Sequence, residues 1–266
     1  NGCVDTDSMT VIVNPPPTVD AGNNTGICIG DSIQLSALGG DIYLWTPADS
    51  ISDVNIFDPI VWPNDTTEYF VLVTDSNGCI NNDSVIITVH PLPNVSAGID
   101  DTICFGDTIQ LLGTGALTYL WSPNDSISDN TVAFPFIWPS DTTDYIVIGT
   151  DGNGCAQSDT VEIVVNVLPI VTAGSDVQIC IGDSTQLSAN GADSYVWTPN
   201  SSLTNAVISD PIAFPTDTTQ YIVQGVDLNG CINTDTIIVI VNPLPNADAG
   251  ANENICENDD LLLIAT

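Results

Sequence analysis

The sequence has 266 residues, with 34 acidic side chains, one histidine and neither lysine nor arginine, so its formal net charge is −34 at pH 7. Without basic groups the chain cannot neutralise nucleic-acid phosphates or anionic lipid headgroups, and it lacks the side chains for Schiff-base, P-loop or isopeptide chemistry. Hydrophobic residues make up 43%, so a buried core is affordable. No apolar run reaches the roughly 20 residues that span a membrane. We therefore expect neither a nucleic-acid partner nor direct membrane insertion.

The cysteines reveal an internal repeat. Their spacing alternates between 25 and 51 residues, so the period is 76, and the positions are Cys3, Cys28, Cys79, Cys104, Cys155, Cys180, Cys231 and Cys256. Other features keep the same step, including Trp45, Trp121 and Trp197. The dipeptide Ala-Gly recurs at 21–22, 97–98, 173–174 and 249–250.

Proline clusters mark the junctions between repeats, for example at 14–17 and 242–245. Such segments favour extended, fairly stiff connections. The predicted organisation is the last strand of a preceding repeat, three complete repeats and the start of a following one, over residues 1–14, 15–90, 91–166, 167–242 and 243–266. Both ends fall inside a repeat, which is typical of a window from a longer array.

Strand signals are dense in each repeat and helix signals are absent. In the second copy the predicted elements are, in chain order, strands at 108–112, 118–121, 132–134, 137–138 and 145–148, and a final strand ending at 165. Turns are expected at 113–115, 139–143 and 151–154, where Asn153-Gly154 supplies a positive φ. About seven short strands around a core tryptophan predict a small all-β sandwich.

The aromatic residues are candidates for the core or for a sugar site. Trp45, Trp121 and Trp197 fit the core of a sandwich, and Tyr69, Tyr145 and Tyr221 resemble the tyrosine corner of such folds. Trp62 and Trp138 precede prolines near a strand end, where the pattern leaves burial or exposure undecided.

The joint pattern resembles a known family. Each copy combines Ala-Gly, Cys-x-Gly-Asp before a Gln-Leu strand, Tyr-x-Trp-x-Pro, Asp-Thr-Thr-x-Tyr and Asn-Gly-Cys, which is similar to the immunoglobulin-like, PKD-related tandem repeats of large Bacteroidota surface proteins. The fourth copy departs from it, with Cys256-Glu257-Asn258-Asp259. The resemblance implies a tandem array of immunoglobulin-like domains, type IX secretion, and a role in adhesins, stalks or extracellular filaments.

Eight regularly placed cysteines in an acidic, extracellular-type array favour disulfides. Zinc is disfavoured because there is no Cys-x-x-Cys pair and only one histidine. In such a sandwich Cys104 and Cys155 should lie at opposite ends, roughly 33 Å apart, far beyond the ~7 Å that a disulfide allows. One hypothesis is therefore bridging between repeats, Cys28 with Cys155 and Cys104 with Cys231, leaving Cys3, Cys79, Cys180 and Cys256 for partners outside this sequence. The alternative pairs Cys28–Cys79, Cys104–Cys155 and Cys180–Cys231 within repeats.

The carboxylates recur in register with the repeat, which is typical of a scaffold and not of a single active site, so no catalytic residue and no cofactor are expected. Ca²⁺ is the one ion with candidate ligands, at the Asp-x-Asn-Gly turns of Asp75, Asp151 and Asp227. The alternative is that these side chains only form the turn.

Asp followed by Ser or Thr and then an apolar residue or Thr is similar to the O-glycosylation motif of exported Bacteroidota proteins. Asp-Ser and Asp-Thr are also ordinary turn and strand-entry dipeptides, so both interpretations stay open. The candidates are Ser8, Ser32, Ser50, Thr66, Ser84, Thr102, Thr108, Ser126, Thr142, Thr160, Ser184, Thr218 and Thr236.

The functional expectation is a non-catalytic structural segment of a stalk or filament at a bacterial cell surface. Its expected partners are neighbouring repeats of the same long chain and identical chains in a filament. The alternative is a repeat module of a secreted adhesin or enzyme that binds carbohydrate or calcium, which exposed Trp62 and Trp138 beside ordered acids would favour.

Overall fold

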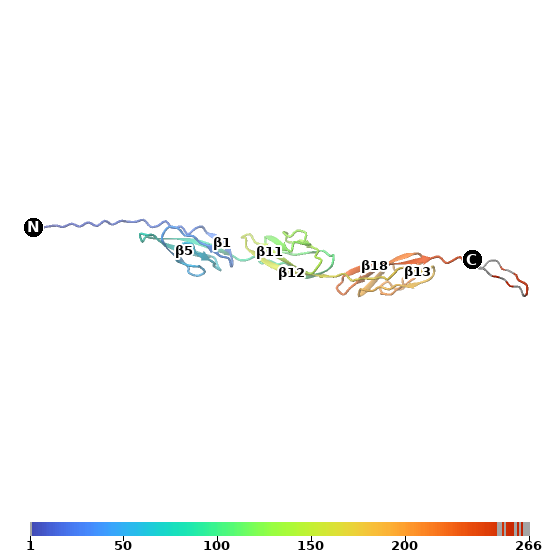
Figure 1. Cartoon of the computed structure of the whole chain (residues 1–266). Helices are drawn as coiled ribbons and strands as arrows, with labels where there is room; N and C mark the ends of the chain where they lie inside the picture. Colours follow the sequence, from blue (N-terminus) through green and yellow to red (C-terminus); the bar gives the residue numbers. More distant parts are fainter. Residues whose placement is uncertain (1, 249–251, 253, 258–259, 261, 263–266) are drawn as a thin grey trace. The chain divides into compact units, whose positions relative to one another are not determined.

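The computed structural model describes residues 2–248, 252, 254–257, 260 and 262. Its regular structure consists of 18 β-strands (Figure 1), and no helix in these residues is long and apolar enough to cross a membrane. The first repeat contains β1 (Thr25–Cys28), β2 (Ile33–Gln34), β3 (Ile42–Thr46), β4 (Ile60–Val61), β5 (Thr67–Thr74) and β6 (Ile80–His90).

The second and third repeats contain the same six strands. Those of the second repeat are β7 (Asp101–Cys104), β8 (Ile109–Gln110), β9 (Thr118–Ser122), β10 (Phe136–Ile137), β11 (Thr143–Thr150) and β12 (Ala156–Asn166). Those of the third repeat are β13 (Val177–Cys180), β14 (Thr185–Gln186), β15 (Ser194–Thr198), β16 (Ile212–Ala213), β17 (Thr219–Val226) and β18 (Ile232–Asn242). The strands thus recur at the 76-residue period of the sequence.

Each repeat packs a four-stranded sheet against a two-stranded one. In the first repeat the sheet order is β1-β6-β5-β3 and the second sheet pairs β2 with β4. The first strand is parallel to the last, whereas β5 pairs antiparallel with both β3 and β6. Two sheets face to face with this mixed order form an immunoglobulin-like β-sandwich. The predicted fold class, a tandem array of such domains, is confirmed.

Alternation along the strands determines the core. On β5 the side chains of Tyr69, Val71 and Val73 are fully buried while Phe70 and Leu72 point outward, as the period of two requires. Trp45 lies at the centre of this core with no exposed surface, and its indole Nε1 donates to the carbonyl of Ile56 at 3.0 Å. Trp121 and Trp197 are buried in the same way, so the prediction that these tryptophans form the core is confirmed.

Several strand boundaries of the second repeat differ from the predicted ones: 108–112, 137–138 and 145–148 are observed as 109–110, 136–137 and 143–150. Two further differences concern whole elements. The segment 132–134 is a series of turns and not a strand, because its backbone turns across the core tryptophan: Val132 accepts from the Trp121 indole and Ala133 accepts from the Gly113 amide. The strand β7 is not among the strands that the sequence analysis locates by residue number, since a four-residue edge strand of mixed polarity carries little periodic signal.

The flanking segments carry less structure. Residues 2–14, expected as the last strand of a preceding repeat, pair with no strand here. The fourth copy is described only in part, and its Ala249-Gly250 and Asn258-Asp259 lie outside the described residues. Both assignments stay predictions.

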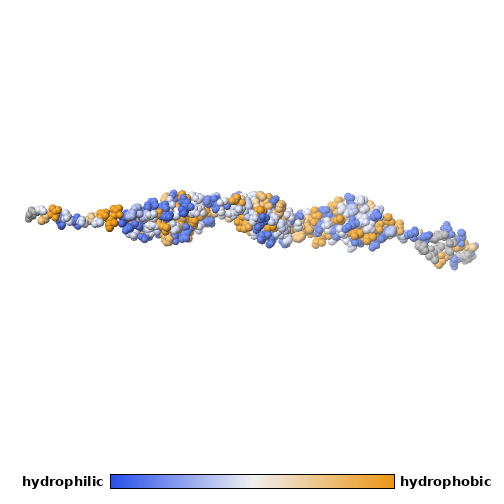
Figure 2. Space-filling model, turned by 90° about the horizontal axis from the view of Figure 1, so that it is seen from above, coloured by the Kyte–Doolittle hydropathy of each residue, from blue (hydrophilic) through white to orange (hydrophobic). Residues whose placement is uncertain are grey.

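The chain divides into two compact units, and the division runs through the second repeat. One unit contains Asn1–Asp101, Thr108–Pro139 and Thr143–Ile163, and the other contains Thr102–Asp107, Ser140–Thr142 and Val164–Thr266. The loop that carries Cys104 therefore groups with the third repeat. Hydrophilic and hydrophobic residues are interspersed on the visible surface of all three repeats (Figure 2).

Candidate functional site: the disulfide junctions between repeats

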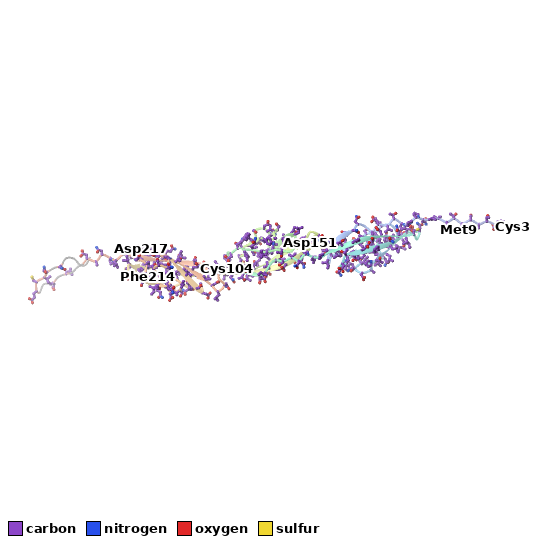
Figure 3. The ribbon with its side chains drawn as sticks, turned by 180° about the vertical axis from the view of Figure 1, so that it is seen from behind. Cys3, Met9, Cys104, Asp151, Phe214 and Asp217 are labelled. Atoms are coloured by element: carbon purple, nitrogen blue, oxygen red, sulfur yellow. A yellow bond between two sulfur atoms is a disulfide. The ribbon has the colours of Figure 1, made fainter. Side chains whose placement is uncertain are left out.

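Two disulfides join consecutive repeats. Cys28 of the first repeat is bonded to Cys155 of the second, and Cys104 of the second repeat, labelled in Figure 3, is bonded to Cys231 of the third. Both pairs are 127 residues apart in sequence, and the Cα atoms of each pair are 5.5 Å apart. The pairs within repeats, the alternative in the sequence analysis, do not form in the structure.

The topology of the sandwich explains this pairing. Because β1 is parallel to β6, Cys28 lies opposite His90, the last residue of β6. Cys79 directly precedes the first residue of β6, which has 11 residues. A strand of that length spans about 35 Å, so Cys28 and Cys79 lie at opposite ends of one sandwich. A cysteine at the far end can therefore bond only to a neighbouring repeat.

One side of each junction is the Cys-x-Gly-Asp turn that follows the first strand. In the first repeat the Asp31 amide donates to the Cys28 carbonyl at 3.0 Å, and the Ile29 amide donates to the His90 carbonyl at 2.9 Å. The same two bonds recur around Cys104 and Cys180. The turn thus holds each cysteine at a fixed place beside the end of the last strand. We call this arrangement the acceptor end of a repeat.

The other side of each junction is the Asp-x-Asn-Gly-Cys hairpin between the last two strands, which we call the donor hairpin. In the second repeat one carboxylate oxygen of Asp151 accepts from the amides of Asn153 at 2.8 Å and Cys155 at 2.9 Å. Gly154 closes the turn with a φ of +87°. Asp75 and Asp227 cap their hairpins in the same way. The aspartate therefore fixes the direction in which the cysteine points.

This use of the aspartates bears on the calcium hypothesis. The oxygen that would be the first ligand of a metal is already the acceptor of two backbone amides in every hairpin. Within the described part of the chain no group of three or more His, Cys, Asp or Glu residues could hold a metal ion. The structure thus uses these residues as turn formers, and Ca²⁺ binding stays a prediction.

The single histidine lies at the first junction. His90 packs so closely over Gly26 that a Cβ at that position would come within 2.6 Å of the imidazole Nε2. Burial raises the pKa of Asp151, but the amides of Cys155 and Asn153, the Asn153 side chain and the positive charge of His90 outweigh burial and lower that pKa below its usual value. This influence is specific to the first junction, because the residues equivalent to His90 in the second and third repeats are Asn166 and Asn242.

Four cysteines carry no disulfide. Cys3 and Cys256 are exposed, and Cys79 and Cys180 are half-buried. Cys79 belongs to the donor hairpin of the first repeat and Cys180 to the acceptor end of the third. By contrast Cys155 and Cys231, whose hairpins are engaged, have no exposed surface. Engagement in a junction thus accompanies complete burial of the hairpin cysteine.

The candidate glycosylation residues divide into two groups by exposure. Ser50, Ser84 and Ser126 are half-buried, and the others are exposed. Some of them have structural roles: the hydroxyls of Thr66, Thr142 and Thr218 each accept an amide of the last strand at 3.1 Å. The remaining exposed candidates are Ser8, Ser32, Thr102, Thr108, Thr160, Ser184 and Thr236.

A further set of structural aspartates was missed in the sequence. Asp83, Asp159 and Asp235 each accept the amide of the alanine in the Ala-Gly motif, at 2.9, 2.9 and 2.7 Å. They connect the start of each repeat to its last strand, 62 residues later. The signal was present as the fixed spacing between Ala-Gly and an Asp-Ser or Asp-Thr pair.

The second set of aromatic residues is half exposed. Trp62, Trp138 and Phe214 have 45%, 47% and 46% of their surface accessible, because they face outward beside the buried Val61, Ile137 and Ala213. Figure 3 labels Phe214 and, a few residues on, Asp217.

Tyr69 and Tyr221 are buried and their hydroxyls bond to Ser50 and Ser202, 19 residues upstream. That partner is more distant in sequence than in a tyrosine corner.

Comparison with known proteins adds little beyond the fold. No family model matches the chain, and no curated protein matches it. Among solved structures, this chain is similar to the eight N-terminal Ig domains of Down syndrome cell adhesion molecule, with 17% sequence identity and a TM-score of 0.41. The match covers 86% of this chain and 37% of that structure. It is also similar to the I9–I11 tandem of titin, with 10% identity and a TM-score of 0.35, where the match covers 85% of this chain and 100% of that one. A third similar structure is hemolin, with 13% identity and a TM-score of 0.32, where the match covers 85% of this chain and 76% of that one.

Proposed function

We propose that this chain is a structural, non-catalytic segment of a stalk or filament of a bacterial extracellular surface protein. The observation that carries the proposal is that each disulfide joins two different repeats, Cys28 to Cys155 and Cys104 to Cys231. Bonds within one domain stabilise that domain alone, whereas bonds between domains prevent neighbours from separating. Covalent connection of consecutive domains is what a tension-bearing element needs.

The composition supports the same role. A chain without lysine or arginine offers no cleavage site to trypsin-like proteases, and its repeats have no lysine or arginine with which to form salt bridges to one another. Disulfides form in oxidising compartments, which favours an extracellular location. The resemblance to Bacteroidota repeats leads us to infer export by type IX secretion.

Localisation tests the proposal directly. Antibodies against the folded chain should decorate fibres or stalks on the outside of intact cells of the source organism in electron micrographs. Labelling that appears only after the cells are permeabilised would contradict the proposal. Preimmune serum is the control for nonspecific binding to the cell surface.

We infer in addition that some of the exposed Ser and Thr candidates carry O-glycans. The support is that none of the 13 is fully buried, and that hydrophilic glycans would cover apolar side chains on the sandwich surface. The intact mass of the native protein, compared with the mass calculated from the sequence, measures occupancy. Equal masses would overturn the inference.

A second candidate function is carbohydrate binding at each repeat. The half-exposed Trp62 and Trp138 favour it, since sugar faces stack on accessible indole rings. Glycan-array binding of the wild-type chain, and of a chain carrying Trp62→Ala and Trp138→Ala, distinguishes the two functions. Glycan binding that the substitutions abolish supports the carbohydrate-binding function. Absence of glycan binding by both chains supports the stalk.

A further inference from the structure

We propose that the acceptor end of the third repeat, at Cys180, is a docking site for the donor hairpin of another repeat of this kind, and that docking ends in a Cys180 disulfide. The inference rests on the proposed function and specifies its partner. The partner is defined by its chemistry: an Asp-x-Asn-Gly-Cys hairpin whose aspartate caps the turn and whose cysteine is a free thiol.

The site has the same backbone frame as the two occupied acceptor ends. Cys180 ends the parallel strand β13 opposite Asn242, just as Cys28 ends β1 opposite His90. The Asp183 amide donates to the Cys180 carbonyl at 3.0 Å, and the Ile181 amide donates to the Asn242 carbonyl at 2.9 Å. These are the bonds found at Cys28 and Cys104, and both of those cysteines hold a donor hairpin.

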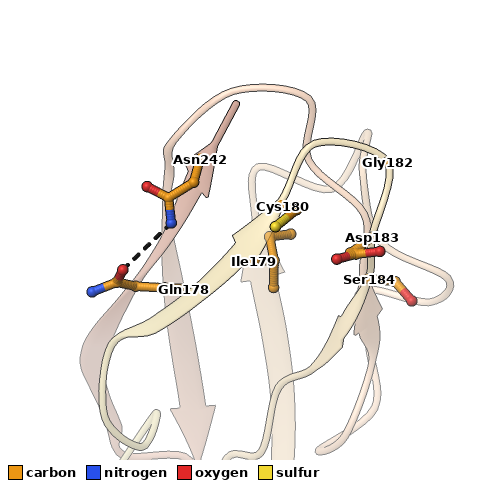
Figure 4. A pocket seen from close by; sticks show the side chains of 7 residues that line it. All are labelled: Gln178, Ile179, Cys180, Gly182, Asp183, Ser184 and Asn242. Carbon is orange, nitrogen blue, oxygen red and sulfur yellow. Dashed lines mark hydrogen bonds between the residues drawn. The ribbon is translucent and has the colours of Figure 1, made fainter. Parts of the chain in front are cut away.

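A hollow beside Cys180 provides space for a partner (Figure 4). Its volume is about 550 Å³, and it is lined by Gln178, Ile179, Cys180, Gly182, Asp183, Ser184 and Asn242. The Asn242 side-chain amide donates to the Gln178 Oε1 at 3.4 Å along one side of it. At the equivalent place in the first repeat, His90 packs over Gly26. The third acceptor end is therefore polar and open.

The same chain also carries an unused donor. The hairpin at Asp75 has the capping bonds of the engaged hairpins, with the Asn77 and Cys79 amides both 2.9 Å from the carboxylate. Its Cys79 is half-buried and carries no disulfide, and its thiol donates to the Asn14 carbonyl at 3.8 Å. The engaged Cys155 and Cys231 are fully buried. The 266-residue chain thus presents a donor hairpin in its first repeat and an acceptor end in its third. Complementary surfaces of this head-to-tail type generate rings where the rotation between copies closes and open chains where it does not.

The covalent step needs a disulfide oxidant such as oxidised glutathione. The Cys180 thiolate attacks one glutathione sulfur and releases one glutathione thiolate. The Cys79 thiolate then attacks the mixed disulfide at the Cys180 sulfur and releases the second glutathione. Two protein thiols lose two electrons and two protons in all, and one oxidised glutathione becomes two reduced ones.

The test uses the full 266-residue chain with Cys3→Ser and Cys256→Ser, which leaves Cys79 and Cys180 as the only free thiols. In a glutathione redox buffer we expect head-to-tail oligomers whose unreduced peptides, released by an aspartate-directed protease, contain Cys79–Cys180 links. Adding either Cys79→Ser or Cys180→Ser should abolish the oligomers. Absence of oligomers, or Cys79–Cys79 and Cys180–Cys180 links as abundant as Cys79–Cys180, would overturn the proposal.

A second variant separates docking from simple thiol collision. Gln178→Trp fills the hollow and should slow formation of the Cys79–Cys180 link at least tenfold, while the reaction of Cys180 with a small aromatic disulfide reagent changes less than twofold. Val196→Trp, on the outer face of β15, is the matched control and should change neither rate. Equal linking rates in the Gln178→Trp and Val196→Trp chains would show that the hollow is not a docking site.

The same peptide maps separate this inference from the proposed function. If Cys28–Cys155 and Cys104–Cys231 are present and Cys79–Cys180 is not, only the docking site fails. If Cys28 is found bonded to Cys79 instead, the bridged array itself fails.

Discussion

At the scale of single residues, several aspartates have specific structural partners in a chain that has no lysine or arginine to pair with them. Asp83, Asp159 and Asp235 accept backbone amides, and so do the aspartates of the donor hairpins. Hydrogen bonds to an ionised acceptor are worth more than neutral ones. These carboxylates therefore stabilise the fold through hydrogen bonds from backbone amides in place of salt bridges.

The bond from the Ala97 amide to Asp159 should be a measurable part of the stability of the second repeat. Asp159→Ala leaves that half-buried amide without its acceptor and should lower the free energy of unfolding by about 1–3 kcal/mol. Amide hydrogen exchange along β12 measures the effect. Asp144→Ala, on the exposed side of β11, is the control, and an equal effect of both substitutions would contradict the assigned role.

The charge of His90 should influence the pKa of Asp151 across the first junction. Because that pKa is below the ordinary 3.8, the ionised carboxylate contributes stability above about pH 4 that is lost as the pH falls. His90→Asn removes the positive charge and should raise the pKa of Asp151, whereas His90→Arg should keep it low. Titration of the Asp151 carboxylate by NMR distinguishes these outcomes. An unchanged pKa in the His90→Asn variant would exclude the interaction.

At the scale of elements, the donor hairpin has to present its cysteine at one position, and this depends on the backbone of its last glycine. Gly154 has a φ of +87°, whereas Gly152 lies outside the positive-φ region and has no atom near its missing Cβ. The two glycines of this hairpin thus differ in their tolerance of a side chain.

Gly154→Ala should therefore destabilise the hairpin by about 1–2 kcal/mol, the cost of a left-handed conformation for a residue with a Cβ. The Cys28–Cys155 disulfide should become correspondingly easier to reduce. Gly152→Ala should leave the midpoint of reduction in a dithiothreitol series unchanged. A shift of the same size for both variants would mean that the positive φ is not what shapes the hairpin.

At the scale of the whole molecule, the two disulfides overlap in sequence, because Cys104 lies between Cys28 and Cys155. A pulling force applied to the ends can pass from Cys28 through the bond to Cys155, back to Cys104 and through the second bond to Cys231. Of the 203 residue-to-residue steps from Cys28 to Cys231 (231 − 28), only the 51 from Cys104 to Cys155 (155 − 104) lie on that path. The crosslinks thus limit how far the array can extend even when its domains unfold.

Single-molecule stretching should reveal this limit. At about 3.6 Å per residue, the segment from Cys28 to Cys231 can reach about 180 Å when oxidised and about 730 Å when reduced. The fully unfolded contour length should therefore increase by about 550 Å on addition of a reductant. A chain with Cys28→Ser and Cys104→Ser should show the long contour in both conditions. An oxidised contour as long as the reduced one would contradict the bridging.

Most of the fold could be predicted from the sequence, because a repeat with period 76 and strand-type alternation leaves few architectures. The same alternation could not decide the exposure of Trp62. Trp62 directly follows the two-residue strand β4, which is too short to show a period of two, and it faces solvent beside the buried Val61. The loop at 132–134 has the apolar composition of a strand, but its carbonyls accept from the Trp121 indole and the Gly113 amide and it belongs to no strand.

The sequence by itself determined the period, the all-β class, the absence of basic side chains and the two alternative sets of cysteine pairs. Only the tertiary structure decided which cysteines meet. The parallel pairing of β1 with β6 places Cys28 beside His90, a whole strand away from Cys79, and a disulfide cannot span that length. The disulfide pairing depends on where the strand ends lie in space, and the spacing of the cysteines along the chain does not determine those positions.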